Sequence, residues 1–466
     1  MRIACVHVPY FALQCLTRVD PSLSAEVPAA VVGGGTPGAP GASVALHGPI
    51  VLGATKSARA LGIRLGMTAT VARSLVPELR IETADASLER ETVRALADAL
   101  LGISPTVDVG GRLGPAGAHL ALYCEVPAKM RGSTFGDRLL SLVASLGVWA
   151  RIGIADDRFT AWVAAAYAAP ESQTGVTSVP RGGSASFLSP RPLSLLAISA
   201  EVQHMLELLG VRTLGEFAAL PSPSVARPFE ADYQALARGE GSSLLRSYAP
   251  DAPIREEHAL LAGAPAEGTG TLFGGAEAVA VVAERIALRL AGRARGAARL
   301  DVSIAGAAPI ASVSVSLAPI HDARVLSDAA SLAEAIGGAV GEVAATRRSS
   351  LARLSVVVTG EAVAADGAAQ IAESVADAAD AALIAAAATA AEESARANAL
   401  TLVLSRSVLD RWQLDPPAAV ASGPELLRAE RRDAHRRTRR SRPRRAEVAQ
   451  PVLFAAMTAA GGAERR

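Results

Sequence analysis

The chain has 466 residues, of which 50% are apolar, and a formal net charge of +1. This length is enough for three or four domains with sizeable cores. The apolar runs, including the alanine-rich stretch at 381–391, are too short or too weakly apolar to span a bilayer, which excludes a transmembrane protein. Residues 428–445 carry ten arginines against two acidic residues, a net charge of +8, so the rest of the chain sums to −7. The sequence thus indicates a basic tail on a near-neutral body.

Three cysteines, Cys5, Cys15 and Cys124, show neither metal-ligand spacing nor a disulfide framework. This use of cysteine fits a reducing compartment. The sequence therefore predicts a cytoplasmic protein without membrane contact, and we expect no bound cofactor.

The first 168 residues mix strands and helices, which predicts an α+β domain. A buried strand at 3–6 runs into a bend at His7 and Pro9, and an apolar helix then begins near Tyr10. The further elements follow in order: a strand at 29–32, a glycine- and proline-rich loop at 33–43, a strand ending near Leu52, a short helix within 54–67 that ends at Gly62, helices at 87–101 and 134–146, a strand at 148–156 and a helix at 158–168.

The next segment is helical with short loops. Its residues 208–221 predict a helix, a turn at Gly210 and Val211, and a second helix with Thr213 as its N-cap. This has the form of a helix-hairpin-helix, in which backbone N–H groups from Gly210 to Gly215 favour a phosphate. An ordinary pair of antiparallel helices is the alternative.

Residues 254–359 predict the order strand, helix, strand, strand, helix, strand, which forms a four-stranded sheet with two helices on one face. The first of these helices, 275–293, carries Arg285, Arg289 and Arg293 at four-residue spacing, so the three side chains share one face. One interpretation is a face that contacts DNA phosphates; the other is a solvated helix face.

Taken in order, these segments resemble the Y-family DNA polymerases and, within them, the ImuB-like branch of bacterial mutasome proteins. The similar segments are VHVPYFALQ at 6–14, SARALGIRLGM at 57–67, ISPTVDV at 103–109, RIGIADDRFTAWVAA at 151–165, and VPRGGSASFLSPRPLSLL with LGVRTLGEFAALP at 179–196 and 209–221. The resemblance implies a right-hand architecture of class α+β. Its expected parts are palm and fingers at 1–168 (fingers about 13–75), a helical thumb at 169–248, a βαββαβ little finger at 249–360, and an extension with a partly disordered tail at 361–466.

The family's reaction needs two divalent ions held by converging carboxylates. By position, the family's first Asp-x-Asp falls here on His7-Val8-Pro9, and its second acidic motif falls on His119, Leu120 and Cys124. Imidazole, proline and thiol cannot replace carboxylates around Mg²⁺. The resemblance therefore implies a polymerase-like fold without catalytic residues and without a metal.

Other positions of the site agree with this interpretation. Lys56 stands where the family has a fingers tyrosine, and Ala12 stands where it has the aromatic sugar-gate residue. Arg59, by contrast, matches the arginine of the family's fingers motif. His7 and His119 could form a transition-metal pair if their strands lie side by side. Histidines that are satisfied or face solvent are the other interpretation, because no third ligand is evident.

The tail beyond residue 360 is expected to contain an alanine-rich helix at about 366–397 and one strand at 399–405, with disorder after them. Its last motif, QPVLF at 450–454, resembles the peptide with which bacterial polymerases bind the sliding clamp. In that mode Leu453 and Phe454 enter an apolar pocket and the Gln450 amide bonds at its rim. A chance apolar patch is the alternative. The arginine run before it is either a DNA contact or a solvated tether.

The resemblance implies a non-catalytic scaffold in translesion DNA synthesis during SOS mutagenesis. Its implied partners are damaged or primed DNA, the sliding clamp (β subunit), the α subunit of an error-prone replicative-type polymerase, and a RecA-like protein of the ImuA type. Two rivals are an active translesion polymerase with a rearranged metal site, and a DNA-binding module that has no clamp partner.

Overall fold

The chain divides into two compact units, Met1–Leu426 and Leu427–Arg466. The computed structural model describes part of the first unit. The described residues are 1–23, 26–33, 48–114, 117–167, 175–221, 228–261, 275–306, 311–316, 327–345 and 351–363. The helix expected at 366–397, the strand expected at 399–405, the arginine run and the clamp-like peptide lie outside the described residues.

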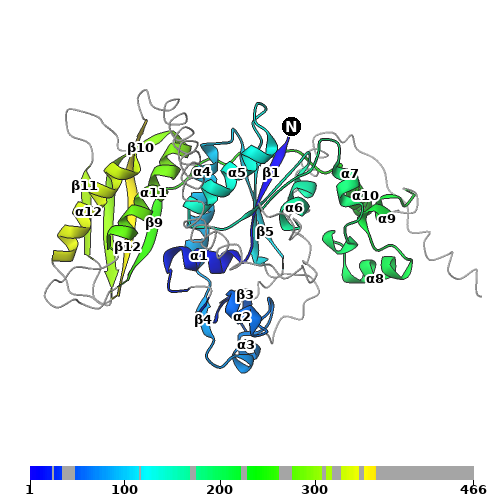
Figure 1. Cartoon of the computed structure of the whole chain (residues 1–466), viewed down its shortest axis with the longest axis horizontal. Helices are drawn as coiled ribbons and strands as arrows, with labels where there is room; N and C mark the ends of the chain where they lie inside the picture. The colour runs from blue at the N-terminus through cyan, green and yellow to red at the C-terminus, as the bar shows by residue number, and fades with distance from the viewer. Residues whose placement is uncertain are drawn as a thin grey trace, which may run out of the picture. The chain divides into compact units, whose positions relative to one another are not determined.

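A five-stranded sheet lies at the centre of the N-terminal part (Figure 1). Its order is β5-β6-β1-β7-β8, and every residue of its central strand is buried. The strands are β1 (Ile3–Val8), β5 (Val107–Leu113), β6 (His119–Glu125), β7 (Arg151–Ala155) and β8 (Val176–Ser178). This central position makes β1 a rigid base for the residues that follow it.

Helices cover both faces of this sheet. α4 (Ala86–Leu101) and α5 (Gly132–Ser145) bury their apolar stripes against one face, together with α1 (Phe11–Val19). α6 (Arg158–Ala166) packs on the other face. It approaches closely at Gly153, where a Cβ would lie 2.1 Å from the Ala161 carbonyl oxygen, so only glycine fits there.

A smaller three-stranded sheet has the order β3-β2-β4. Its elements are β2 (Ala29–Gly33), β3 (Ile50–Ala54), β4 (Arg80–Thr83), α2 (Lys56–Ala60) and α3 (Ala69–Leu75). The predicted helix end at Gly62 is confirmed, because Gly62 has a φ of 97°. The short strand β4, which pairs parallel to β2, carries no alternating pattern and was not predicted.

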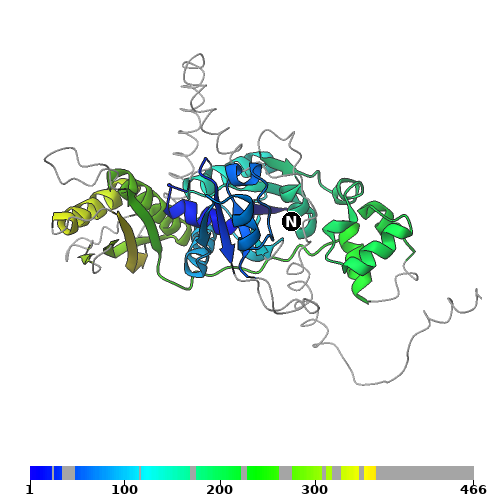
Figure 2. The same ribbon diagram turned by 90° about the horizontal axis from the view of Figure 1, so that it is seen from below.

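The segment from 184 to 237 is a cluster of short helices, seen from a second direction in Figure 2. They are α7 (Ser184–Leu188), the 3₁₀ turn η2 (Leu193–Leu195), α8 (Ala200–Leu208), α9 (Leu214–Ala218) and α10 (Pro228–Ala237). The predicted helical hairpin is confirmed, with Thr213 as the N-cap of α9.

The predicted βαββαβ order is also confirmed. Four antiparallel strands pair in the order β11-β10-β12-β9, and two helices bury their apolar residues on one face of them (Figure 1). The elements are β9 (Arg255–Leu261), α11 (Gly275–Arg293), β10 (Arg295–Gly306), β11 (Ala311–Ser316), α12 (Ala329–Ala345) and β12 (Leu351–Val363).

The expected α+β class is therefore confirmed over the described residues, and the mixed N-terminal part, the helical segment and the βαββαβ unit follow one another in the expected order. None of the described helices combines the length and apolarity that a membrane span needs.

Candidate functional site

The two predicted histidines meet at the end of the central strand. β1 and β6 pair antiparallel, with Val8 opposite Leu120, so His7 and His119 project from the same face of neighbouring strands. Their ring centroids are 5.4 Å apart. The backbone N–H of Tyr10, a residue in the left-handed region at φ 48°, donates to Nδ1 of His119 at 3.1 Å. The two strands therefore lie side by side, which was the condition for a histidine pair, and the Nδ1 atom of His119 is satisfied by the Tyr10 N–H.

The structure does not bring Pro9 or Cys124 into the same group. Cys124 pairs with Ala4, and its side chain belongs to the core on the other face of the sheet. Burial raises the pKa of its thiol to about 12. Pro9 contributes its carbonyl oxygen, which accepts a hydrogen bond from Gln14 Nε2 at 2.6 Å. The position predicted as the third degenerate ligand is thus a core residue.

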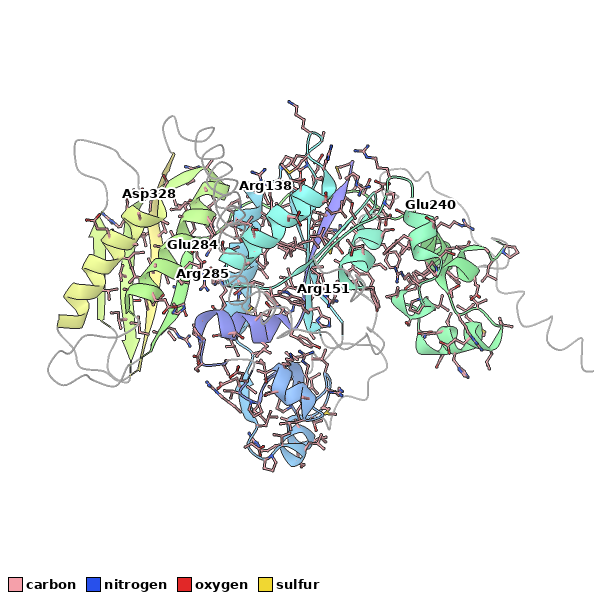
Figure 3. All side chains as sticks on the ribbon, in the orientation of Figure 1. Arg138, Arg151, Glu240, Glu284, Arg285 and Asp328 are labelled. Atoms are coloured by element: carbon pink, nitrogen blue, oxygen red, sulfur yellow. The ribbon has the colours of Figure 1, made fainter. Side chains whose placement is uncertain are left out.

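The electrostatic environment of the histidines is positive. Burial, then His119 and Arg151, lower the pKa of His7 well below its ordinary value. Burial and Arg112 lower the pKa of His119 to about 4. Arg151 lies directly across from His7 on β7 and is labelled in Figure 3. Both imidazoles are therefore neutral at pH 7, with guanidinium groups near them.

This donor set does not fit the two divalent ions of the family. Among the described residues, no three histidine, cysteine, aspartate or glutamate side chains gather into a metal-binding group. The buried carboxylate of Asp108, on β5, pairs with Arg158 at 3.1 Å and accepts the Arg246 N–H at 2.7 Å. The Asp108 carboxylate is therefore already paired, and among the described residues Mg²⁺ would meet two imidazoles without a converging group of carboxylates.

Arg59 lies next to this site. Thr55 caps α2 by accepting the Ala58 N–H, which sets the helix that carries Arg59. The Arg59 guanidinium stacks 5.0 Å from the centroid of the Tyr10 ring, and Lys56 is exposed on the same short helix. Sequence reasoning did not single out Arg112 and Arg151. The pattern of their strands does not mark them, because β5 also contains Asp108 and Arg151 is the first residue of β7.

The predicted phosphate site at the helical hairpin is already occupied by the chain itself. The N–H of Gly210 donates to the Glu207 carbonyl oxygen, and that of Val211 to the Leu206 carbonyl oxygen. The N–H groups of Arg212 and Thr213 donate to one Glu216 carboxylate oxygen, at 2.7 and 2.9 Å. The Gly215 N–H, at the start of α9, donates to the Ser189 carbonyl oxygen at 3.0 Å.

Glu216 is the residue that corrects this prediction. It completes a capping box with Thr213, and the N–H groups of Arg212 and Thr213 lower the pKa of its carboxyl group. An ionised carboxylate thus occupies the place where a phosphate would bind. We therefore revise Gly210, Val211, Thr213 and Gly215 from phosphate ligands to parts of a self-capped hairpin.

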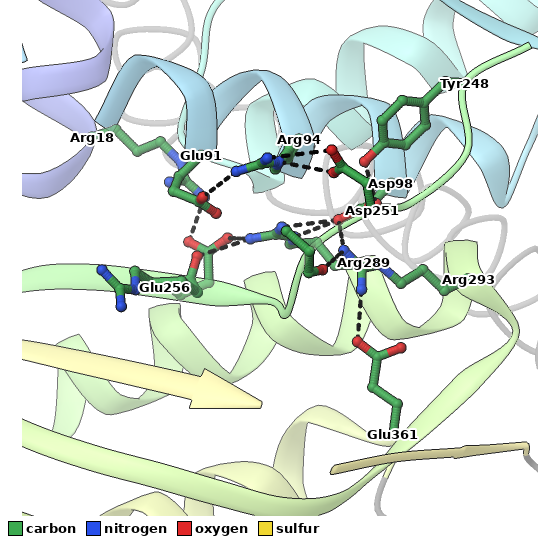
Figure 4. Close-up of polar contacts among 12 residues, drawn as sticks. Arg18, Glu91, Arg94, Asp98, Tyr248, Asp251, Glu256, Arg289, Arg293 and Glu361 are labelled. Carbon is green, nitrogen blue, oxygen red and sulfur yellow. Dashed lines mark hydrogen bonds and ion pairs between the residues drawn. The ribbon is translucent and has the colours of Figure 1, made fainter. Parts of the chain in front are cut away.

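The arginines predicted on α11 also face inward. Arg289 is fully buried and bonds to Asp98 on α4 at 2.9 Å and to Glu256 on β9 at 3.0 Å (Figure 4). Arg293 bonds to Asp98 at 2.9 Å and to Glu361 at 2.6 Å. Asp98 is itself fully buried. These pairs join the four-stranded sheet domain to the helix beneath the central sheet.

A third guanidinium from α1 completes this network. Arg18 bonds to Glu256 at 2.5 Å, and Arg285 donates to the Arg18 carbonyl oxygen at 3.2 Å. Burial and the neighbouring Arg18 lower the pKa of Arg285 to about 9. In this arrangement Arg285, Arg289 and Arg293 are interface residues and do not form a phosphate-contacting face. The two interpretations raised from the sequence both assumed exposure, and both are wrong here.

Three exposed arginines of this domain lie instead on the open face of its sheet. Arg299 on β10, Arg353 on β12 and Arg255 on β9 alternate with buried residues that face the helices, so they point away from α11 and α12. Arg353 pairs with Glu257 at 3.4 Å on that face. Strand alternation in the sequence could have indicated these residues.

Comparison with known proteins agrees with the N-terminal architecture. Residues 6–166 match the model of the impB/mucB/samB (IMS) family. A protein named DNA polymerase IV from Dehalococcoides mccartyi is 32% identical over 179 residues, which cover 37% of this chain and 43% of that protein. A protein named ImuB from Caulobacter vibrioides is 27% identical over 175 residues, covering 36% of this chain and 35% of that protein.

The chain therefore aligns with less than half the length of these curated relatives. Among solved structures, DinB from Sulfolobus solfataricus is similar with a TM-score of 0.43 and 14% identity, over 78% of this chain and all of that one. A ternary complex of Dbh gives the same TM-score, identity and coverage.

Proposed function

We propose that the protein is a non-catalytic, Y-family-like scaffold of the ImuB type that acts in translesion DNA synthesis. The observation that carries this proposal is the His7–His119 pair. Two neutral imidazoles, 5.4 Å apart and flanked by Arg112 and Arg151, stand where the family's chemistry needs carboxylates. A site of this charge has no means of holding two Mg²⁺ ions on the triphosphate and the primer hydroxyl.

DNA binding remains part of the proposal, through a different surface from the one that the sequence suggested. The open face of the β9–β12 sheet carries Arg255, Arg299 and Arg353, together with Glu257, Asp301 and small residues such as Ser303 and Ser355. Guanidinium groups on a flat sheet can contact phosphates on successive nucleotides without reading sequence. Such binding should weaken steeply with added salt.

The partners follow from the resemblance and stay proposals. They are the sliding clamp (β subunit), which would take Gln450, Leu453 and Phe454; the α subunit of an error-prone replicative-type polymerase; and a RecA-like protein of the ImuA type. A scaffold with these partners would work in the cytoplasm at the nucleoid.

Primer extension with the purified full chain tests the proposal. We expect no nucleotide incorporation on a primed template, with Mg²⁺ or with Mn²⁺, because the described residues gather no carboxylates at the palm site. Binding to the same DNA, measured on the same preparation, must be intact for an absence of incorporation to support the proposal. Incorporation that disappears in a His7→Ala or His119→Ala variant would show an active polymerase with a rearranged metal site.

The clamp peptide is tested separately. Replacing Gln450, Leu453 and Phe454 together by alanine should abolish binding to the sliding clamp, because both apolar anchors and the rim hydrogen bond are removed. Binding of the full chain to immobilised clamp is the measurement, and a Val452→Ala variant is the matched control. An unchanged affinity in the triple variant would favour a DNA-binding module that has no clamp partner.

A further inference from the structure

An extended linker connects the helical cluster to the four-stranded sheet domain. It covers residues 238–254, between the end of α10 and the start of β9, and forms neither a helix nor a strand. Domains joined by such a segment usually move relative to one another, unless an extensive interface holds them together. Whether the sheet domain can move therefore depends on the contacts of the linker and of the interface beside it.

The linker is hydrogen-bonded to the edge of the five-stranded sheet. Four of its residues bond to the edge strand β5 or to the first residue of α6, with donor–acceptor distances from 2.7 to 3.4 Å: Ser242, Leu244, Arg246 and Tyr248. The Tyr248 N–H, for example, donates to the Val107 carbonyl oxygen at 2.7 Å. The four are alternate residues, as in an extended chain that lies along a sheet. The linker is thus attached to the N-terminal part at several successive points.

Asp98 on α4 joins the linker and the sheet domain at one point. Its carboxylate accepts a hydrogen bond from the Tyr248 hydroxyl at 3.0 Å, and one each from Arg289 and Arg293 at 2.9 Å (Figure 4). Asp98 is fully buried, so water does not replace any of these donors. Separating the two parts would leave a carboxylate and two guanidinium groups without their partners, which is strongly unfavourable for buried charges.

The two helices that meet at this interface are in direct backbone contact. A Cβ at Gly292 on α11 would lie 1.8 Å from the Asp98 carbonyl oxygen, and a Cβ at Gly102, just after α4, would lie 3.4 Å from the Gly292 Cα. Glycine is what allows the backbones to approach so closely. Interiors packed at this density are stiff, so a displacement of α4 is transmitted to α11.

We propose that the linker and the Asp98 cluster lock the sheet domain to the N-terminal part, so that the two move as one rigid body with and without DNA. The Asp98 cluster consists of Asp98, Tyr248, Arg289 and Arg293. The open face of the sheet then has a preset position, and a preorganised surface binds without the cost of ordering it. The lock itself does not depend on the proposed function, because it rests on contacts within the chain.

Pulsed electron paramagnetic resonance on the full chain tests the lock. Nitroxide labels on Ser141→Cys in α5 and Glu334→Cys in α12, both exposed positions, report the distance between the two parts. A reference pair, Ser141→Cys with Arg90→Cys in α4, lies within the N-terminal part and gives the width expected of a rigid body. The three native cysteines are buried, and burial raises the pKa of their thiols, so the reagent should not label them.

We expect a single distance distribution between the two parts, as narrow as that of the reference pair and unchanged by saturating primed DNA. Asp98→Asn should broaden it at least about twofold, because the substitution removes the charge that both arginines need. Asp251→Asn is the matched control. Asp251 also pairs with an arginine of α4, Arg94, at 3.1 Å, but its side chain is 66% exposed, so the distribution should stay narrow.

Two results would overturn the proposal. A wild-type distribution that is broader than the reference, or that shifts when DNA is added, would show that the sheet domain moves. An Asp98→Asn distribution as narrow as the wild type would show that the Asp98 cluster is not the lock. If Asp98→Asn does not fold, Tyr248→Phe takes its place, because it removes only one hydroxyl from the cluster and should also broaden the distribution. If the chain does not bind DNA, the proposed DNA binding fails, while the width of the wild-type distribution still tests the lock.

Discussion

Replacing Glu256 by glutamine should lower the free energy of unfolding by about 3–5 kcal/mol, the usual cost of removing one partner from a buried ion pair. Burial alone would raise the pKa of Glu256, but the guanidinium groups of Arg18, Arg289 and Arg285 hold it below its ordinary value. The carboxylate is fully buried, with Arg18 at 2.5 Å and Arg289 at 3.0 Å. Glutamine keeps the shape and removes the charge, so two guanidinium groups would remain buried beside a neutral amide. Urea unfolding followed by circular dichroism measures the change.

The neighbouring residue provides the control. Glu257 lies on the open face of the same strand and pairs with Arg353, whose side chain is 48% exposed. Glu257→Gln should therefore cost less than about 1 kcal/mol, as exposed pairs do. Equal effects of the two substitutions would contradict a closed, ion-paired interface. A rise in DNA affinity in the Glu256→Gln variant would show that the α11 arginines bind phosphate once they are released.

The fold could be predicted from the sequence where periodicity was strong. The βαββαβ order followed from apolar alternation in strands such as Leu351–Val363 and from the long amphipathic stripe of α11 (Gly275–Arg293). The end of a helix at Gly62 followed from the need for a positive φ. The four-residue strand β4 has no periodicity, and only its pairing with β2 makes it a strand.

The candidate site was predictable in part for the same kind of reason. That His7 and His119 meet follows from motif position in a resembling family, and strand pairing then places them on one face. Side-chain partners, however, are set by tertiary contacts. The four-residue spacing puts the arginines of α11 on one face whether that face is exposed or buried. Only the fold shows that Asp98, far away in sequence, pairs with Arg289 and Arg293 on that face.

A single residue can also change what a motif binds while the sequence pattern of that motif stays recognisable. The hairpin has the glycine turn and the N-cap that indicate a phosphate site, and both are present in the structure. Glu216, three residues after the cap, turns the same backbone into a closed capping box. The pattern of a capping box was visible in the sequence, and it predicts that the N–H groups are already satisfied.

Substituting His119 by asparagine should remove a large part of the protein's sensitivity to mild acid. The pKa of His119 is lowered from 6.5 to about 4 by burial and by Arg112. Between these two values the unfolded chain binds a proton that the folded chain does not, so the free energy of unfolding falls as the pH decreases through this window. The difference amounts to roughly 3 kcal/mol by pH 4. Asparagine does not titrate, and its Oδ1 can still accept the Tyr10 N–H.

Urea unfolding of wild type and variant at a series of pH values from 7 to 4 measures this difference. We expect the His119→Asn curve to be flatter, so that the unfolding free energies of the two proteins converge as the pH falls. The reason is that only the wild type has an imidazole at position 119 that takes up a proton on unfolding. His204→Asn, on the exposed surface of α8, is the matched control and should run parallel to the wild type. Parallel curves for His119→Asn as well would mean that His119 is hydrated in solution. The palm site would then be open enough to accept a cation, and the charge argument against polymerase chemistry would lose its basis.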